Sequence, residues 1–139
     1  MPEDSAIESK SLAVGVAKIA DEMRARDVVV LDVSDVLGLT DYFVIASGTS
    51  RRQLKAMSEE VVKVLKRNGV QRLFLSGQEE SGWVLIDFGE VVVHLFSADA
   101  RGYYTLESLW EDAPRLDWAS EETTLERVSE ETPPSAEIP

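Results

Sequence analysis

The chain has 139 residues, a formal net charge of −12 at pH 7, no cysteine and a single histidine. This length predicts one domain with a substantial core. The absence of cysteine excludes thiolate metal sites, and a single histidine excludes multi-histidine zinc sites. The acidity argues against independent binding to nucleic acid, because recognition of phosphates depends on lysine and arginine.

Helical and strand patterns follow one another along the chain. In order, we expect a helix over 5–26, strands over 27–35 and 41–48, a helix over 50–68, a strand over 70–76, a hairpin over 83–96 and a short helix before Pro114. Each long helix carries one apolar stripe: Leu12, Val16, Ile19, Ala20 and Met23 in the first, and Leu54, Met57, Val61, Val64 and Leu65 in the second. The order predicts an α/β fold, with a mixed five-stranded sheet and flanking helices on one face.

The stretch WVLIDFGEVVVHLF, residues 83–96, predicts two strands joined by a turn at Gly89 and Glu90. Counting outward from this turn gives the opposed pairs, whose side chains share a face. One face holds Phe88 with Val91, Ile86 with Val93, and Val84 with Leu95, and it is wholly apolar. The other face holds Asp87 with Val92, Leu85 with His94, and Trp83 with Phe96.

This second, mixed set has two interpretations. It has the composition of a binding face, since it is too apolar to be left in water and too polar for a clean core. Alternatively, a second helical layer covers it, and Asp87 and His94 are satisfied internally. The third helix is too short to cover the whole face, which favours the exposed binding face.

The turn SGTSRRQ, residues 47–53, is the stretch most typical of an enzyme. A helix start beside Arg51 and Arg52 attracts phosphate, yet Ser50 and Gln53 have capping-box spacing that explains the turn without a ligand. A magnesium-dependent nucleotidyl- or phosphoryl-transfer enzyme would also need converging carboxylates, for which the candidates are Asp32, Asp41 and Asp87. Nothing in their spacing demands such a site, and Asp41 at the end of a loop and Asp87 just before a hairpin turn have ordinary structural explanations as well.

The aromatic residues suggest a different class of site. Trp83 and Tyr104, grouped with Asp87, His94 and Arg101, form a candidate interface hot spot, because tryptophan, tyrosine and arginine anchor protein interfaces. The structural alternatives are that the aromatic residues belong to the core, and that a lone strand histidine is a hydrogen-bonded structural residue.

The end of the chain differs in composition from the rest. Residues 119–139 contain six glutamates, one arginine and three prolines, and we expect them to form a disordered acidic tail after a folded domain over 5–118. The polar first ten residues and the lack of an apolar run of about 18 residues predict a soluble cytoplasmic protein with no membrane partner.

Three motifs in this order and spacing carry a resemblance to a known family. They are TDYFVIASGTSRRQ, GWVLIDFGEVVVHLF and RGYYTLESLW, and with them residues 8–118 resemble the ribosomal silencing factor family, also called the Iojap-related family. The resemblance implies a nonenzymatic protein without a cofactor. It would bind the large ribosomal subunit through that subunit's fourteenth protein, prevent joining of the small subunit and lower translation when nutrients are scarce.

The resemblance also implies a nucleotidyltransferase-like topology without the catalytic groups, and a homodimer. Carried over motif by motif, Trp83, Asp87 and Tyr104 would contact the ribosomal protein, and His94 and Arg101 match family positions with either a contact or a structural role. The mixed face of the hairpin would then be the docking face, or a dimer interface only.

Overall fold

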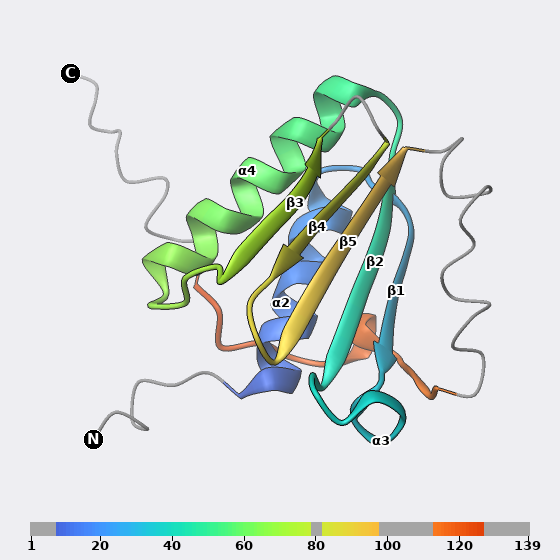
Figure 1. Cartoon of the computed structure of the whole chain (residues 1–139), viewed down its shortest axis with the longest axis vertical. Coiled ribbons are helices and arrows are strands. Elements are labelled where there is room, and N and C mark those ends of the chain that lie inside the picture. The colour runs from blue at the N-terminus through green and yellow to red at the C-terminus, as the bar shows by residue number, and fades with distance from the viewer. Residues whose placement is uncertain (1–7, 79–81, 98–112, 127–139) are drawn as a thin grey trace.

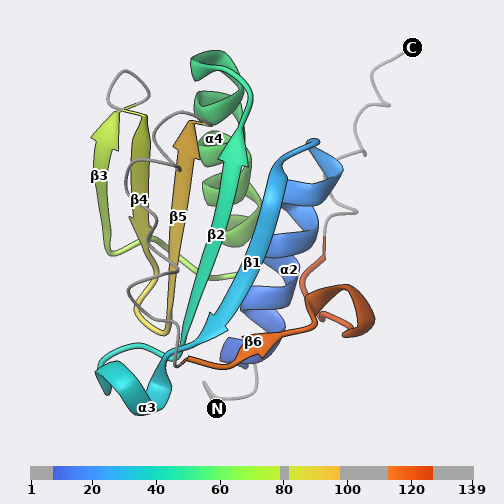
Figure 2. The same cartoon turned by 90° about the vertical axis from the view of Figure 1, so that its right-hand side faces the viewer.

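The computed structural model describes residues 8–78, 82–97 and 113–126, and it shows a sheet with two helices packed on one face (Figures 1 and 2). A short helix lies between the two longer ones in the sequence. After the last strand of the hairpin, the described residues form a small strand and one turn of 3-10 helix. The elements are α2 (Ser9–Glu22), β1 (Arg26–Asp32), α3 (Ser34–Leu37), β2 (Tyr42–Gly48), α4 (Arg51–Arg67), β3 (Phe74–Gln78), β4 (Trp83–Asp87), β5 (Val91–Ser97), β6 (Arg115–Leu116) and η1 (Trp118–Ser120).

The sheet is mixed, as predicted, but it has six strands in the order β3-β4-β5-β2-β1-β6. β2 and β5 are parallel at its centre, and every other neighbouring pair is antiparallel. The expected count of five was wrong because Arg115 and Leu116 pair with Leu31 and Val30 at the outer edge of β1. A two-residue strand has no period that a sequence pattern can reveal.

The predicted hairpin is confirmed in its register. Trp83 pairs with Phe96, Leu85 with His94 and Asp87 with Val92. The turn closes with the Phe88 amide donating to the Val91 carbonyl at 2.9 Å. Gly89 has a φ of 94°, which suits glycine at the first turn position.

The main core lies between the sheet and the helices α2 and α4. Both predicted apolar stripes face it, and all of their residues are buried except Met23, which is partly buried. From the hairpin, the predicted apolar face joins the same core through Val84, Ile86, Phe88, Val91, Val93 and Leu95. Alternation along the strands therefore assigned the core face correctly.

Three boundaries differ from the sequence prediction. The first helix ends at Glu22, and Arg24, with a φ of 70°, follows it before β1 begins at Arg26. The strand expected through residue 35 stops at Asp32, whose Oδ1 accepts hydrogen bonds from the Ser34 amide at 3.1 Å and the Ser34 hydroxyl at 2.7 Å. This Asx-type turn ends the strand and leads the chain into α3. The third strand begins at Phe74, four residues later than expected.

Residues 119–126, expected to belong to the disordered tail, pack against α2 instead. Leu125 is buried over Gly15, and a Cβ on that glycine would lie 2.6 Å from the Leu125 Cδ2 atom. The Thr123 hydroxyl donates to the Ser11 carbonyl at 2.7 Å. The predicted boundary after residue 118 is therefore too early, because one well-placed leucine and long-range hydroxyl bonds to α2 hold an otherwise acidic segment. The short helix expected between 98 and 113 lies almost entirely outside the described residues.

Candidate functional site: the mixed face of the sheet

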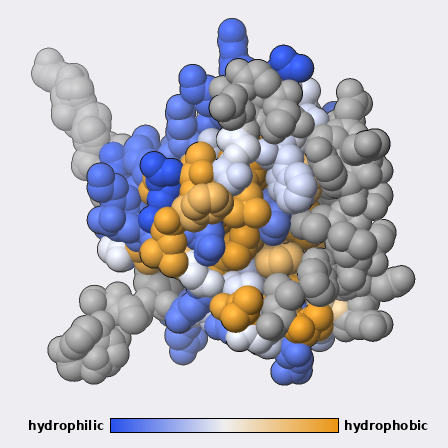
Figure 3. All heavy atoms as spheres, in the orientation of Figure 1, coloured by the Kyte–Doolittle hydropathy of each residue, from blue (hydrophilic) through white to orange (hydrophobic). Residues whose placement is uncertain are grey.

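The face of β3, β4 and β5 that points away from α2 and α4 is the candidate site. We call it the mixed face and define it by the side chains of Phe74, Trp83, Leu85, Asp87, Val92, His94 and Phe96. The side chains of Trp83, Leu85, Asp87 and Val92 are partly buried, while that of Phe74 is 57% exposed. Figure 3 shows apolar surface gathered in the middle of this view of the molecule, with polar surface beside it.

An aromatic cluster makes up the buried part of the mixed face, together with Phe43 of β2 on the same side of the sheet. The ring of His94 lies edge-on to Phe43, with 4.6 Å between ring centroids, and Trp83 stacks on Phe96 at 5.2 Å. Phe43, His94 and Phe96 are all buried, which leaves Trp83 as the member that reaches the surface. Packing against the rigid rings of Phe96 and His94 fixes the orientation of the Trp83 indole.

His94 serves this cluster as a hydrogen-bond acceptor. The Trp83 indole Nε1 donates to His94 Nδ1 at 3.3 Å, so the neutral ring carries its proton on Nε2. Burial lowers the pKa of His94 to about 4, because an imidazolium would lose its hydration there. Within the described part of the chain, Nε2 finds no hydrogen-bond partner. These contacts fit the structural alternative for His94, with the ring positioning Trp83 from below.

Asp87 lies at the hairpin end of the mixed face. Its Oδ1 accepts a hydrogen bond from the Gly89 amide at 2.8 Å, which is an Asx-type contact that holds the turn. The side chain is only partly buried, so the carboxylate also contributes charge to the surface beside Phe74, its cross-strand neighbour.

Phe74 is a site residue that the sequence analysis missed. It pairs with Asp87 across β3 and β4, and this places its ring on the mixed face. The stretch RLFLS holds three consecutive large apolar residues. The pairing of β3 with β4 was needed to tell which of them points to the mixed face. The other predicted site residues, Tyr104 and Arg101, lie outside the described residues.

The turn at residues 47–53 is explained by helix capping. The Ser50 hydroxyl accepts from the Gln53 amide at 3.1 Å, as predicted from the spacing. The Gln53 side chain accepts from the Thr49 amide and hydroxyl, and its Nε2 donates to the Met23 carbonyl at 2.7 Å. The hydroxyl and amide groups of Thr49, Ser50 and Gln53 are therefore used to start α4 and to tie it to the end of α2.

The three candidate carboxylates do not meet at this turn. Asp32 and Asp41 lie at the start of β2, about 20 Å from its end at Gly48, given the rise of a seven-residue strand. Asp32 shares the helix-covered face with Tyr42, whereas Asp87 belongs to the mixed face. Among the described residues, no group of three or more acidic or histidine side chains is placed to hold a metal ion. Likewise, no described helix is long and apolar enough to cross a membrane.

Comparison with known proteins agrees with this architecture. The profile of a family described as "Ribosomal silencing factor during starvation" matches residues 6–138. A ribosomal silencing factor from Bacillus subtilis is 42% identical over 108 residues, which cover 78% of this chain and 92% of that protein. A mouse protein named for mitochondrial assembly of the ribosomal large subunit is 42% identical over 89 residues, or 62% of this chain and 39% of its own length.

A solved structure shares the fold as well. A crystal structure of a Chromobacterium violaceum protein is 34% identical to this chain, with a TM-score of 0.71, over 75% of this chain and 87% of the other. Profile, relatives and fold agree with the three motifs, and we conclude that the chain belongs to the ribosomal silencing factor family.

Proposed function

We propose that this protein binds the large ribosomal subunit through that subunit's fourteenth protein and, by occupying the site, blocks joining of the small subunit. The result is lower translation when nutrients are scarce. The observation that carries the proposal is the mixed face, which presents Trp83 and Phe74 at the surface over a rigid aromatic support. Membership of the family supplies the ribosome as the partner.

The mixed face has the features of a protein-binding hot spot. Partly exposed aromatic residues on a preorganised surface contribute much of the affinity in protein interfaces. Trp83 is held by stacking on Phe96 and by its bond to His94, so little conformational entropy is lost when it is covered. Trp83, Asp87 and Tyr104 are the proposed contacts. Arg101 is proposed as a further contact, and His94 as a positioning residue.

Charge supports the choice of a ribosomal protein as partner. The chain has a net charge of −12, whereas ribosomal proteins are usually basic, and complementary charge accelerates encounter. Blocking subunit joining needs no chemical turnover. An interface of about 800 Å² per partner is sufficient if it lies where the small subunit must dock.

The proposal places the protein in the cytoplasm, where ribosomes initiate, and includes a homodimer in the absence of ribosomes. A dimer that used the mixed face would compete with ribosome docking. The nucleotidyltransferase-like topology implied by the family resemblance is part of the same proposal, with the fold acting as a binding scaffold and no catalytic step.

Cosedimentation with purified ribosomal subunits tests the proposal. The wild-type protein should sediment with large subunits and reduce the formation of joined ribosomes when small subunits are added. Trp83→Ala should weaken binding to large subunits by at least about 2 kcal/mol, or about 30-fold in Kd, because it removes the central aromatic anchor.

Trp118→Ala is the matched control, since Trp118 is also partly buried but packs with the core cluster on the helix side and donates to the Val28 carbonyl at 3.1 Å. Circular dichroism should show that both variants are folded. The placement of the site is wrong if folded Trp83→Ala binds like the wild type. The ribosome proposal itself fails if the wild type stays in the supernatant at micromolar concentration.

A further inference from the structure

The positive charges of this acidic chain are concentrated in one segment. Residues 51–72 hold seven of the 14 lysines and arginines and only two of the 26 acidic residues, a local net charge of +5 against −17 for the rest. All seven cationic side chains are exposed: Arg51, Arg52, Lys55, Lys63, Lys66, Arg67 and Arg72. They lie on α4 and on the segment that joins it to β3.

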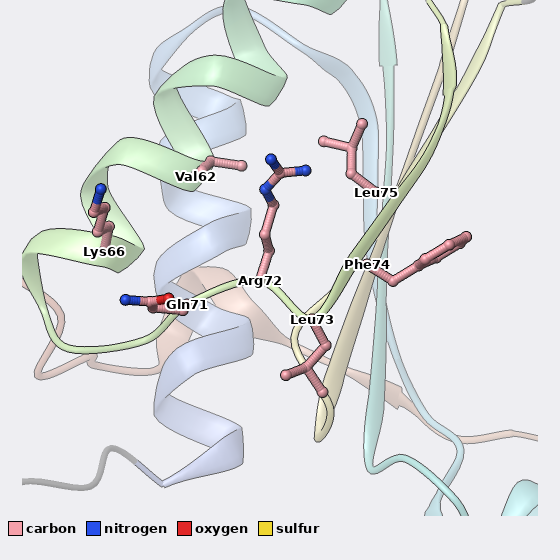
Figure 4. Close-up of a pocket in the computed structure, with 7 residues that line it drawn as sticks. All are labelled: Val62, Lys66, Gln71, Arg72, Leu73, Phe74 and Leu75. Carbon is pink, nitrogen blue, oxygen red and sulfur yellow. The ribbon is translucent and has the colours of Figure 1, made fainter.

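A groove between α4 and β3 combines these charges with apolar surface. It has a volume of about 600 Å³ and is lined by Val62, Lys66, Gln71, Arg72, Leu73 and Leu75, together with Phe74. Figure 4 shows the Arg72 guanidinium between Val62 and Leu75, while the Phe74 ring points to the other side of the strand. Leu73 is 71% exposed and Leu75 is 37% exposed, so the groove offers uncovered apolar contacts. β3 is also the edge strand of the sheet on this side.

The chain returns to this groove just before its last residues. The Asn68 side chain, at the end of α4, donates to the Glu126 carbonyl at 2.9 Å and accepts from the Glu126 amide at 2.9 Å. Glu126 is thereby held at Asn68, which lies two positions along the chain from Lys66 and three from Gln71. The last 13 residues, 127–139, start at this anchor.

We propose that residues 127–139 dock along the groove between α4 and β3 of the same molecule. This segment carries Glu130, Glu131 and Glu137 for the lysine and arginine side chains, and Val128 and Ile138 for the exposed leucines. Opposite charge and shared apolar character support this segment as the occupant, and the bonds between Glu126 and Asn68 start it beside the groove.

The geometry of the tether favours this contact over one between molecules. Thirteen extended residues reach about 43 Å, and a 17-residue helix such as α4 is about 25 Å long. A short tether gives an effective concentration of about 1 mM, so a groove affinity of about 0.1 mM would keep the segment bound about nine-tenths of the time. This inference does not depend on ribosome binding.

Paramagnetic relaxation in NMR tests the docking on the full chain. The protein has no cysteine, so Ser135→Cys gives a single attachment site for a nitroxide label. The label should strongly weaken the amide signals of Val62, Leu73 and Leu75. The charge reversal Lys66→Glu with Arg72→Glu should lower the paramagnetic relaxation rates of these amides to about half of their wild-type values, because a tenfold weaker groove affinity lowers the occupancy from about nine-tenths to about one half.

Arg51→Glu with Arg52→Glu is the matched control, because it reverses two exposed charges of the same basic segment at the far end of α4 and should leave the weakening unchanged. The proposal is overturned if the label leaves the groove signals intact, or if both pairs of reversals act alike. It is also overturned if the weakening arises only between a labelled molecule and an unlabelled one, which would mean docking on a second copy. Unchanged amide shifts elsewhere show that each variant is folded.

Discussion

The buried histidine should make this protein less stable in acid, and one variant can separate its contribution from that of the other titrating groups. His94 is 4% exposed, its Nδ1 accepts from the Trp83 indole, and its pKa is lowered to about 4. We predict that His94→Asn removes this sensitivity, because asparagine offers an amide oxygen to the indole and does not titrate. The variant is less stable than the wild type at pH 7, where the aromatic packing is lost without compensation.

The magnitude follows from the two pKa values of the wild type. Histidine in the unfolded chain has a pKa of about 6.5, and in the folded state the pKa is about 4. Between these values the unfolded state binds more protons, so stability is complete above pH 6.5 and decreases as the pH falls toward 4. The free energy of unfolding of the wild type should therefore fall by about 2 kcal/mol more than that of His94→Asn between pH 7 and pH 5.

Urea unfolding of both proteins at several pH values measures this difference, and the many carboxylates cancel because both proteins share them. Because His94 is the single histidine, its ring signals in NMR also report the folded-state pKa without ambiguity. Parallel stability curves for the two proteins, or a ring that titrates near 6.5, would show that the imidazole is hydrated and that the buried cluster is wrongly described.

Substitutions at three further positions test the fold. Gly77→Ala should destabilise the protein by at least about 2 kcal/mol and displace Trp83, since φ is +89° and a Cβ would lie 2.1 Å from the Trp83 carbonyl oxygen. A shift in tryptophan fluorescence emission together with a lower midpoint of urea unfolding would show it. Leu125→Ala should cost about 2 to 3 kcal/mol in the same assay, because it uncovers Gly15, and a change under 0.5 kcal/mol would mean that residues 119–126 do not pack there. Ser50→Ala should cost about 1 kcal/mol through loss of the helix cap, whereas Ser50→Asn should cost little.

The parts of the fold that the sequence predicted are those with strong local signals. The hairpin register followed from the position of Gly89 and alternation along the strands, and α4 followed from an apolar stripe between a serine cap and a glycine stop. The parts that it missed depend on distant contacts. β6 exists because β1 offers a free edge, and residues 119–126 are held by α2, over a hundred positions away.

The candidate site shows the same division. Pairing in the hairpin placed Trp83, Asp87 and His94 on one face, but it left open which of them reach the surface. Burial of His94 depends on Phe43, which comes from β2 and has no local link to the hairpin. Phe74 joined the face only when the start of β3 was known, because a shift of one residue would have turned its ring toward α4.

The closure of α2 by the end of the chain has a consequence for how the protein is made. The Thr123 and Leu125 contacts that cover α2 join residues about 110 positions apart, so they cannot form until residue 125 has left the ribosome. We expect the nascent chain to hold an incomplete core, with one side of α2 bare, until these distant residues have emerged and packed against the helix.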